Sequence, residues 1–145
     1  MTPDQVRVIR ESFAELAPIG DAVAMLFYSR LFQIDPDLAQ LFVSTDRKAQ
    51  GRKLMAALAF VVNGADRPAT LLAPLQALAR RHVAYGVEEE HYATVGEALI
   101  DTLAAHFGPR FTPHLRDAWL AAYTLVSGVM ITATRAPAPE TAAAA

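Results

Sequence analysis

Four polar residues lie at helical spacing among apolar residues, in positions where their side chains could do chemistry. His82 follows Leu75 and Leu78 on one helical stripe, and a neutral imidazole facing an apolar slot can bind a metal ion. A histidine near the C-terminal end of a helix can also complement the helix dipole, or pack in a core with its nitrogens satisfied. Taken alone, His82 fits these structural interpretations better than a metal site.

The other three polar residues are Tyr28, Gln50 and Tyr92, and each lies on an apolar helical face. A buried tyrosine usually packs in the core and needs only one partner for its hydroxyl, which is the simplest interpretation of both tyrosines. Gln50 alone is better interpreted as a partly exposed residue in the first turn of its helix. Each residue is a weak indication of a site, and only their combination favours one.

The composition excludes several classes of protein and of site. The chain has 145 residues, the length of one domain, and 53% of them are hydrophobic while 19% are charged, which excludes global disorder. The 13 basic and 15 acidic residues give a net charge of −2, so the overall balance indicates neither a nucleic-acid nor an anionic-membrane partner. Because the chain has no cysteine, it has no disulfide, thiolate nucleophile, iron–sulfur cluster or cysteine zinc site.

The sequence also lacks the signals of export and of membrane insertion. Its first residues do not follow the basic-then-apolar pattern of a secretory signal. No uninterrupted apolar run reaches about 18 residues, the length that would indicate a membrane span. We therefore expect a soluble, cytoplasmic protein.

Helix signals recur along the chain, and strand signals are nearly absent. Capping residues, prolines at first helical positions and apolar residues three or four apart mark the helices, and three glutamates at 88–90 fit a solvated first turn. The sequence predicts an all-α fold with a short helix over 35–42 and six main helices over about residues 3–16, 21–34, 44–64, 69–86, 88–106 and 112–134. A domain over residues 1–134 precedes a Pro/Ala-rich tail over 135–145, which we expect to be disordered.

Six motifs, in order and at matching spacing, give the chain a resemblance to a known family. They are FYSRLF at 27–32, DPDL at 35–38 with LF at 41–42, QGRKLM at 50–55, RHVAYGV at 81–87, YATVGEAL at 92–99 and DAWLAAY at 117–123. Over about residues 2–132 the chain resembles bacterial single-domain globins and the globin domain of flavohaemoglobins. The resemblance implies the globin fold, in which helices pack around a haem pocket.

The resemblance also implies a role for each candidate residue. His82 is then the proximal ligand of the iron of haem b (iron protoporphyrin IX), with the sixth coordination position open. Phe42 packs flat against the porphyrin, Tyr28 and Gln50 are the distal pair that donates hydrogen bonds to O2, and Tyr92 lies on the proximal side. The apolar slot is completed by Leu54, Leu58, Leu78, Val87, Val95 and Val126.

Two departures from flavohaemoglobins limit what the resemblance implies. In those proteins a glutamate of the last helix joins the tyrosine and the histidine in a hydrogen-bonded set, but Thr134 stands at the expected position here. We therefore expect less peroxidase-like activation through the histidine. The chain also ends where flavohaemoglobins continue into flavin- and NAD-binding domains, so we expect its iron to depend on a separate reductase.

These expectations lead to one main hypothesis for the function and three alternatives. The main hypothesis is a bacterial haemoglobin that reversibly binds O2, and also CO and NO, at five-coordinate ferrous iron with high O2 affinity. The first alternative is an enzyme, a nitric-oxide dioxygenase that detoxifies NO with the help of a separate reductase. The others are a gas sensor that acts through a partner protein and a helical domain of globin-like fold without haem. We expect a monomer or a weak homodimer.

Overall fold

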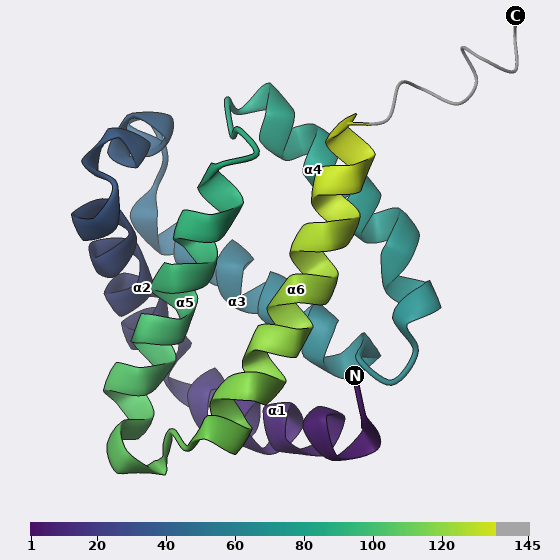
Figure 1. Cartoon of the computed structure of the whole chain (residues 1–145). Helices are drawn as coiled ribbons and strands as arrows, with labels where there is room; N and C mark the ends of the chain where they lie inside the picture. Colours follow the sequence, from purple (N-terminus) through teal and green to yellow (C-terminus); the bar gives the residue numbers. More distant parts are fainter. Residues whose placement is uncertain (136–145) are drawn as a thin grey trace, which may run out of the picture.

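The computed structural model describes residues 1–135, which fold into a bundle of helices (Figure 1). Its six α-helices are α1 (Pro3–Leu16), α2 (Gly20–Ile34), α3 (Arg47–Gly64), α4 (Leu72–Ala84), α5 (His91–Phe107) and α6 (Pro113–Arg135). Four short 3-10 helices join or extend them: η1 (Ala17–Ile19), η2 (Pro36–Phe42), η3 (Pro68–Leu71) and η4 (Gly108–Arg110). Since this part of the chain contains no strand, the all-α prediction is confirmed, and so is the short helix, which is η2.

The predicted capping residues begin their helices. The Thr2 hydroxyl accepts a hydrogen bond from the backbone N–H of Gln5 at 3.1 Å, and the Gln5 side chain accepts one from the Thr2 N–H at 3.0 Å. Ser44, Thr45 and Asp46 before α3 are all of types that cap helices. Asp46 is the one that caps α3, because its carboxylate accepts the backbone N–H of Lys48 at 3.0 Å. α3 therefore begins at Arg47, three residues before Gln50, and this cap fixes the register of Gln50 on the helix.

The segment between α4 and α5 differs from the prediction. The helix expected to open with the three glutamates at 88–90 begins at His91 instead, so this boundary was wrong. Gly86 has a φ of 93°, a left-handed conformation that ends α4 in a sharp turn. The backbone N–H of Glu88 then donates a hydrogen bond to Nδ1 of His91 at 2.9 Å. This bond to a side chain replaces the bond to a backbone carbonyl that a helix would require, so the glutamates stay in a turn.

The helices pack in two groups, each with its own hydrophobic cluster. α2 packs against α3 and α5, α4 packs against α6, and α1 crosses the lower end of α6 (Figure 1). The larger cluster, here the first cluster, joins α1, α2, α5 and α6 around Ile9, Phe27, Leu103 and Trp119. The second cluster lies along α4, α6 and the start of α5, and its buried members are Leu71, Leu75, Ala79, Tyr92 and Met130.

The end of α6 coincides with the end of the described chain. α6 includes Arg135, which the sequence analysis assigned to the tail, and the remainder of the predicted tail, residues 136–145, lies outside the described residues. Within residues 1–135, none of the helices has the length and apolar character needed to cross a membrane.

Candidate functional site

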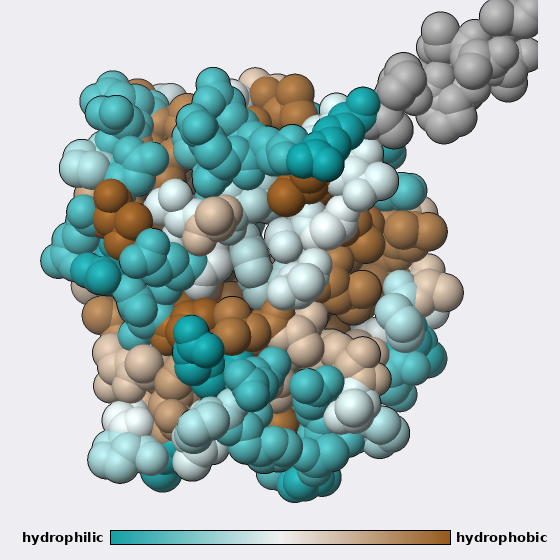
Figure 2. Space-filling view, in the orientation of Figure 1, coloured by the Kyte–Doolittle hydropathy of each residue, from teal (hydrophilic) through white to brown (hydrophobic). Residues whose placement is uncertain are grey.

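The predicted slot residues are divided between the two hydrophobic clusters. Four of them, Phe42, Leu54, Leu58 and Val95, pack against the first cluster, whereas Leu78, Val87 and Val126 pack against the second. All seven side chains are only partly buried. Each therefore leaves some apolar surface uncovered by the rest of the chain, and a flat apolar group such as a porphyrin would gain hydrophobic free energy by covering such surface. Figure 2 draws the side of the molecule on which α5 and α6 lie, and it shows apolar and weakly polar surface between hydrophilic upper and lower ends.

His82 lies in the last turn of α4 with one ring nitrogen already engaged. Its Nδ1 donates a hydrogen bond to the backbone carbonyl of Leu78 at 2.9 Å, which fixes the tautomer and leaves the lone pair of Nε2 free. Burial lowers the pKa of the His82 imidazole, the bond to Leu78 opposes this effect, and the Arg81 charge lowers it further. The side chain is thus a neutral imidazole of fixed orientation, which is what a metal ligand requires.

The turn after α4 holds His82 close to the segment that carries Phe42. The carbonyl of His82 accepts the backbone N–H of Val87 at 2.9 Å and that of Tyr85 at 3.1 Å, so the chain is tied back onto the end of the helix. At Gly86, an added Cβ would lie 3.3 Å from a methyl carbon of Leu41 in η2. The end of α4 and the end of η2 are therefore in close contact, and this contact joins the proximal to the distal part of the site.

Tyr28 and Gln50 meet where α2 crosses α3. The crossing is close at Gly51, where an added Cβ would lie only 2.9 Å from the Cβ of Ala24, one turn before Tyr28. Burial raises the pKa of the Tyr28 hydroxyl, and the nearby Gln50 side chain and the charge of Arg47 oppose that rise. The structure thus brings the predicted distal pair together, with a tyrosine that stays protonated and can donate.

Aromatic rings surround Tyr28 on the side of η2. The ring of Phe42 packs edge-on at 5.5 Å from that of Tyr28, measured between centroids, and Phe32 lies 5.6 Å from Phe42. The guanidinium of Arg47 covers the Phe32 ring at 4.7 Å. Phe42 thus lies beside Tyr28, and its packing against a porphyrin stays a prediction.

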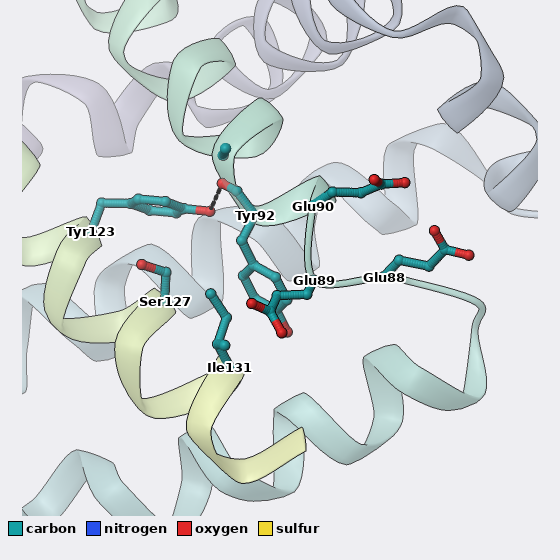
Figure 3. A pocket seen from close by; sticks show the side chains of 8 residues that line it. Glu88, Glu89, Glu90, Tyr92, Tyr123, Ser127 and Ile131 are labelled. Atoms are coloured by element: carbon teal, nitrogen blue, oxygen red, sulfur yellow. Dashed lines mark hydrogen bonds between the residues drawn. The ribbon is translucent and has the colours of Figure 1, made fainter. Parts of the chain in front are cut away.

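Tyr92 is buried in the second cluster, but its hydroxyl has no hydrogen-bond partner among residues 1–135. Its backbone carbonyl accepts the hydroxyl of Tyr123 at 2.5 Å (Figure 3). Thr134 donates its own hydroxyl to the carbonyl of Ile131 at 2.8 Å. Within residues 1–135, neither the Tyr92 nor the Thr134 hydroxyl therefore bonds to His82, whose Nδ1 donates to the Leu78 carbonyl.

A separate pocket of about 620 Å³ opens between the start of α5 and α6 (Figure 3). Tyr92 stands in its wall, and the remaining lining comes from Glu88, Glu89, Glu90, Ala93, Tyr123, Ser127 and Ile131. Glu88, Glu90 and His91 bring ligand atoms within 4.8 Å of one another, but the glutamates are exposed. The sequence analysis identified neither this pocket nor the charges of Arg47 and Arg81, although both arginines are close in sequence to Gln50 and His82.

Comparison with known proteins identifies a family and several relatives of this chain. The family model described as Globin matches residues 26–130. The flavohemoprotein of Bordetella pertussis is 33% identical over 138 residues, which cover 94% of this chain and 34% of that protein. The flavohemoproteins of Vibrio cholerae and Deinococcus radiodurans are 30% and 29% identical over 133 residues, 90% of this chain. The chain spans about a third of the length of these curated relatives.

Proposed function

The chain belongs to the globin family, and on that premise we propose that it holds haem b in the slot between its two clusters and reversibly binds O2 there. The observation that carries this proposal is His82, a neutral imidazole locked by its bond to Leu78 on a helix bordered by half-buried apolar residues. When bound, the haem iron supplies an open coordination position for a diatomic gas, which no side chain can offer.

The proximal half of the site orients one ligand atom. Nε2 of His82 is the donor atom, because Nδ1 is occupied by the Leu78 carbonyl. As the acceptor of the Nδ1–H bond, the neutral carbonyl makes the imidazole less electron-donating than a carboxylate would, and no carboxylate of residues 1–135 bonds to His82. This arrangement supports binding of a gas more than activation of an oxygen–oxygen bond.

The distal half of the site offers two hydrogen-bond donors. The Tyr28 hydroxyl, kept protonated by burial, and the Gln50 amide lie together on the first-cluster side of the slot. O2 accepts more negative charge from ferrous iron than CO does, so both donors favour O2. A hydrogen bond to a charged group contributes about 1–3 kcal/mol, and each 1.4 kcal/mol slows release about tenfold. We therefore expect high O2 affinity, with CO and NO as further ligands.

The test compares the release of two gases from one variant. Wild type and Tyr28→Phe are loaded with hemin and reduced, and the dissociation rates of O2 and CO are measured by rapid mixing. Tyr28→Phe should release O2 about 10-fold to 100-fold faster, which corresponds to one strong hydrogen bond, and CO almost unchanged. Tyr85→Phe, an exposed tyrosine, is the control and should release both gases as wild type does.

Two results would contradict the proposal at different levels. If Tyr28→Phe changes the release of O2 and CO by the same factor, the donor role of Tyr28 is wrong. If wild-type protein mixed with hemin develops no Soret band, the proposal of a haem site is wrong.

A further inference from the structure

The pocket of about 620 Å³ between the turn before α5 and the side of α6 has an acidic end and a hydroxyl end. The acidic end is formed by the glutamates at 88–90, and Tyr123, Ser127 and Ile131 line the pocket from one stripe of α6. Figure 3 shows the glutamates on one side, Tyr123 and Ser127 on the other, and Tyr92 between them. The volume is within the range of about 300–1,000 Å³ that is typical of small-molecule sites.

The Tyr92 hydroxyl is a buried polar group in the wall of this pocket. The residue is 8% exposed, and its hydroxyl forms no hydrogen bond within residues 1–135. Its side chain extends from the start of α5 toward the space between Glu89 and Ile131 (Figure 3). A buried hydroxyl without a partner costs free energy, and a ligand that bonds to it in the pocket would remove that cost. This hydroxyl therefore indicates a ligand independently of the glutamates.

The protons of the two other hydroxyls in the pocket are already engaged. Tyr123 donates its hydroxyl to the backbone carbonyl of Tyr92 at 2.5 Å, and Ser127 donates to the carbonyl of Thr124 at 3.4 Å. Their oxygens therefore offer only lone pairs to a ligand. The ring of Tyr123 packs closely against α5 at Gly96, where an added Cβ would lie 2.7 Å from a ring carbon. The hydroxyl end is thus held in place before a ligand binds, and it favours a ligand that donates hydrogen bonds.

The acidic end of the pocket carries uncompensated negative charge. Glu89 is paired with Arg135, whose Nε lies 2.9 Å from the carboxylate. Glu88 and Glu90, in contrast, form no ion pair with any residue of 1–135, and no Lys or Arg of this part of the chain lines the pocket. Two negative charges therefore remain beside the pocket, and they favour a cationic ligand.

The hydrogen bonding of His91 favours an organic cation over a metal ion. Ligand atoms of Glu88, Glu90 and His91 lie within 4.8 Å of one another. However, Nδ1 of His91 accepts the backbone N–H of Glu88 at 2.9 Å, so the neutral ring carries its proton on Nε2 and has no lone pair left for a metal. Two exposed carboxylates also supply fewer oxygens than the roughly 6–8 that Ca²⁺ takes. An ammonium group needs only acceptors for its N–H bonds, and this pocket supplies them.

We propose that this pocket binds a small aliphatic diamine in its doubly protonated form. One ammonium group pairs with the two unpaired glutamates, and the other donates hydrogen bonds to the hydroxyl oxygens of Tyr92, Tyr123 and Ser127. The methylene groups between them pack against Ile131. The two positive charges of the ligand match the two uncompensated carboxylates. This inference does not rest on the proposed function, because the haem slot takes no part in it.

The experiment titrates the full chain, labelled with ¹⁵N, with 1,4-diaminobutane at low ionic strength and follows the amide signals by two-dimensional NMR. In wild type, saturable shifts should be concentrated at residues 88–93 and 123–131. Butane-1,4-diol, a neutral molecule of the same length, should cause no saturable shift there. Tyr92→Phe should raise the Kd of the diamine about 10-fold or more, because it loses one hydrogen bond to a charged group. Glu90→Gln should raise it about 3-fold to 5-fold, as expected for an exposed ion pair.

The matched control is Glu97→Gln, which removes the same charge from an exposed glutamate of α5 that does not line the pocket. Its Kd should stay within about 1.5-fold of wild type. An equal loss in Glu97→Gln and Glu90→Gln would show attraction by the overall negative charge and would overturn the proposal. Unchanged binding in Tyr92→Phe, equal binding of the diol, or no saturable shift in wild type would also overturn it. So would shifts of the same amides by Ca²⁺ but not by the diamine.

The same samples keep this inference separate from the proposed function. A chain that takes up hemin is measured reduced and under CO, which keeps it diamagnetic, and a chain that takes up none is measured as purified. Absence of hemin uptake contradicts only the proposed function, and absence of diamine binding contradicts only the diamine pocket.

Discussion

The hydroxyl of Tyr92 is a buried polar group with no hydrogen-bond partner among the described residues, on the proximal side of the proposed haem slot. Burial raises its pKa, so the hydroxyl remains neutral. A buried group that makes no hydrogen bond costs free energy, whereas a phenylalanine of the same shape avoids that cost. The sequence indicated that Thr134 replaces the glutamate which in flavohaemoglobins joins the tyrosine and the histidine. Only the structure shows that Nδ1 of His82 bonds to the Leu78 carbonyl.

The hydroxyl of Tyr123 does have a partner, the Tyr92 carbonyl, and a pair of Tyr→Phe variants compares the two hydroxyls. Tyr92→Phe should leave the free energy of unfolding unchanged or raise it slightly. Tyr123→Phe loses the hydrogen bond to the Tyr92 carbonyl and should lower it by about 1 kcal/mol. Urea unfolding followed by circular dichroism measures both. A loss of more than about 1.5 kcal/mol in Tyr92→Phe would mean that its hydroxyl has a partner in solution.

The crossing of α2 and α3 positions the distal pair, and a glycine permits it. Gly51 presents no side chain to Ala24, so the two backbones approach closely enough for Gln50 to reach Tyr28. The sequence predicted both helices and capping residues for α3, because capping and apolar spacing are local signals. It could not predict the approach at Gly51, which depends on two residues far apart in the chain. It also misplaced the start of α5, where a His91 side chain replaces helical bonding.

Gly51→Ala should therefore disturb the site as well as the fold. The new Cβ would lie 2.9 Å from that of Ala24, so α3 must shift, at a cost of about 1–3 kcal/mol in unfolding free energy. Release of O2 from the hemin-loaded variant should become faster, because Gln50 moves with α3. The control is Gly128→Ala in α6, where the added Cβ meets nothing within 4 Å; it should stabilise the helix by about 0.5–1 kcal/mol. Equal stability of the two variants would contradict the close crossing.

The described chain has two hydrophobic clusters, and each predicted slot residue packs against one of them. The family motifs carry Phe42, Leu54, Val87 and Val95, and the resemblance implied the other slot residues, but the sequence could not show that they divide between two clusters. A bound porphyrin would join the two clusters into a single core.

Hemin should accordingly raise the temperature of unfolding. At a free hemin concentration 1,000 times its Kd, binding to the folded state alone contributes about 4 kcal/mol. For a chain of this size, that corresponds to a rise in Tm of roughly 8–15 °C. Differential scanning calorimetry without hemin and with hemin in an excess that gives this free concentration measures the shift. An unchanged Tm would show that hemin does not bind between the clusters.

The iron ligand itself is tested most directly by removing it and supplying it again. The absorption spectrum of ferrous, hemin-loaded protein is recorded for wild type, for His82→Gly and for His82→Gly with added imidazole, with His114→Gly as the control for an exposed histidine. We expect a five-coordinate ferrous spectrum in wild type and in His114→Gly. This spectrum should be lost in His82→Gly and should return when imidazole fills the space left by the His82 side chain. A Soret band that is the same in wild type and in His82→Gly without imidazole would contradict it.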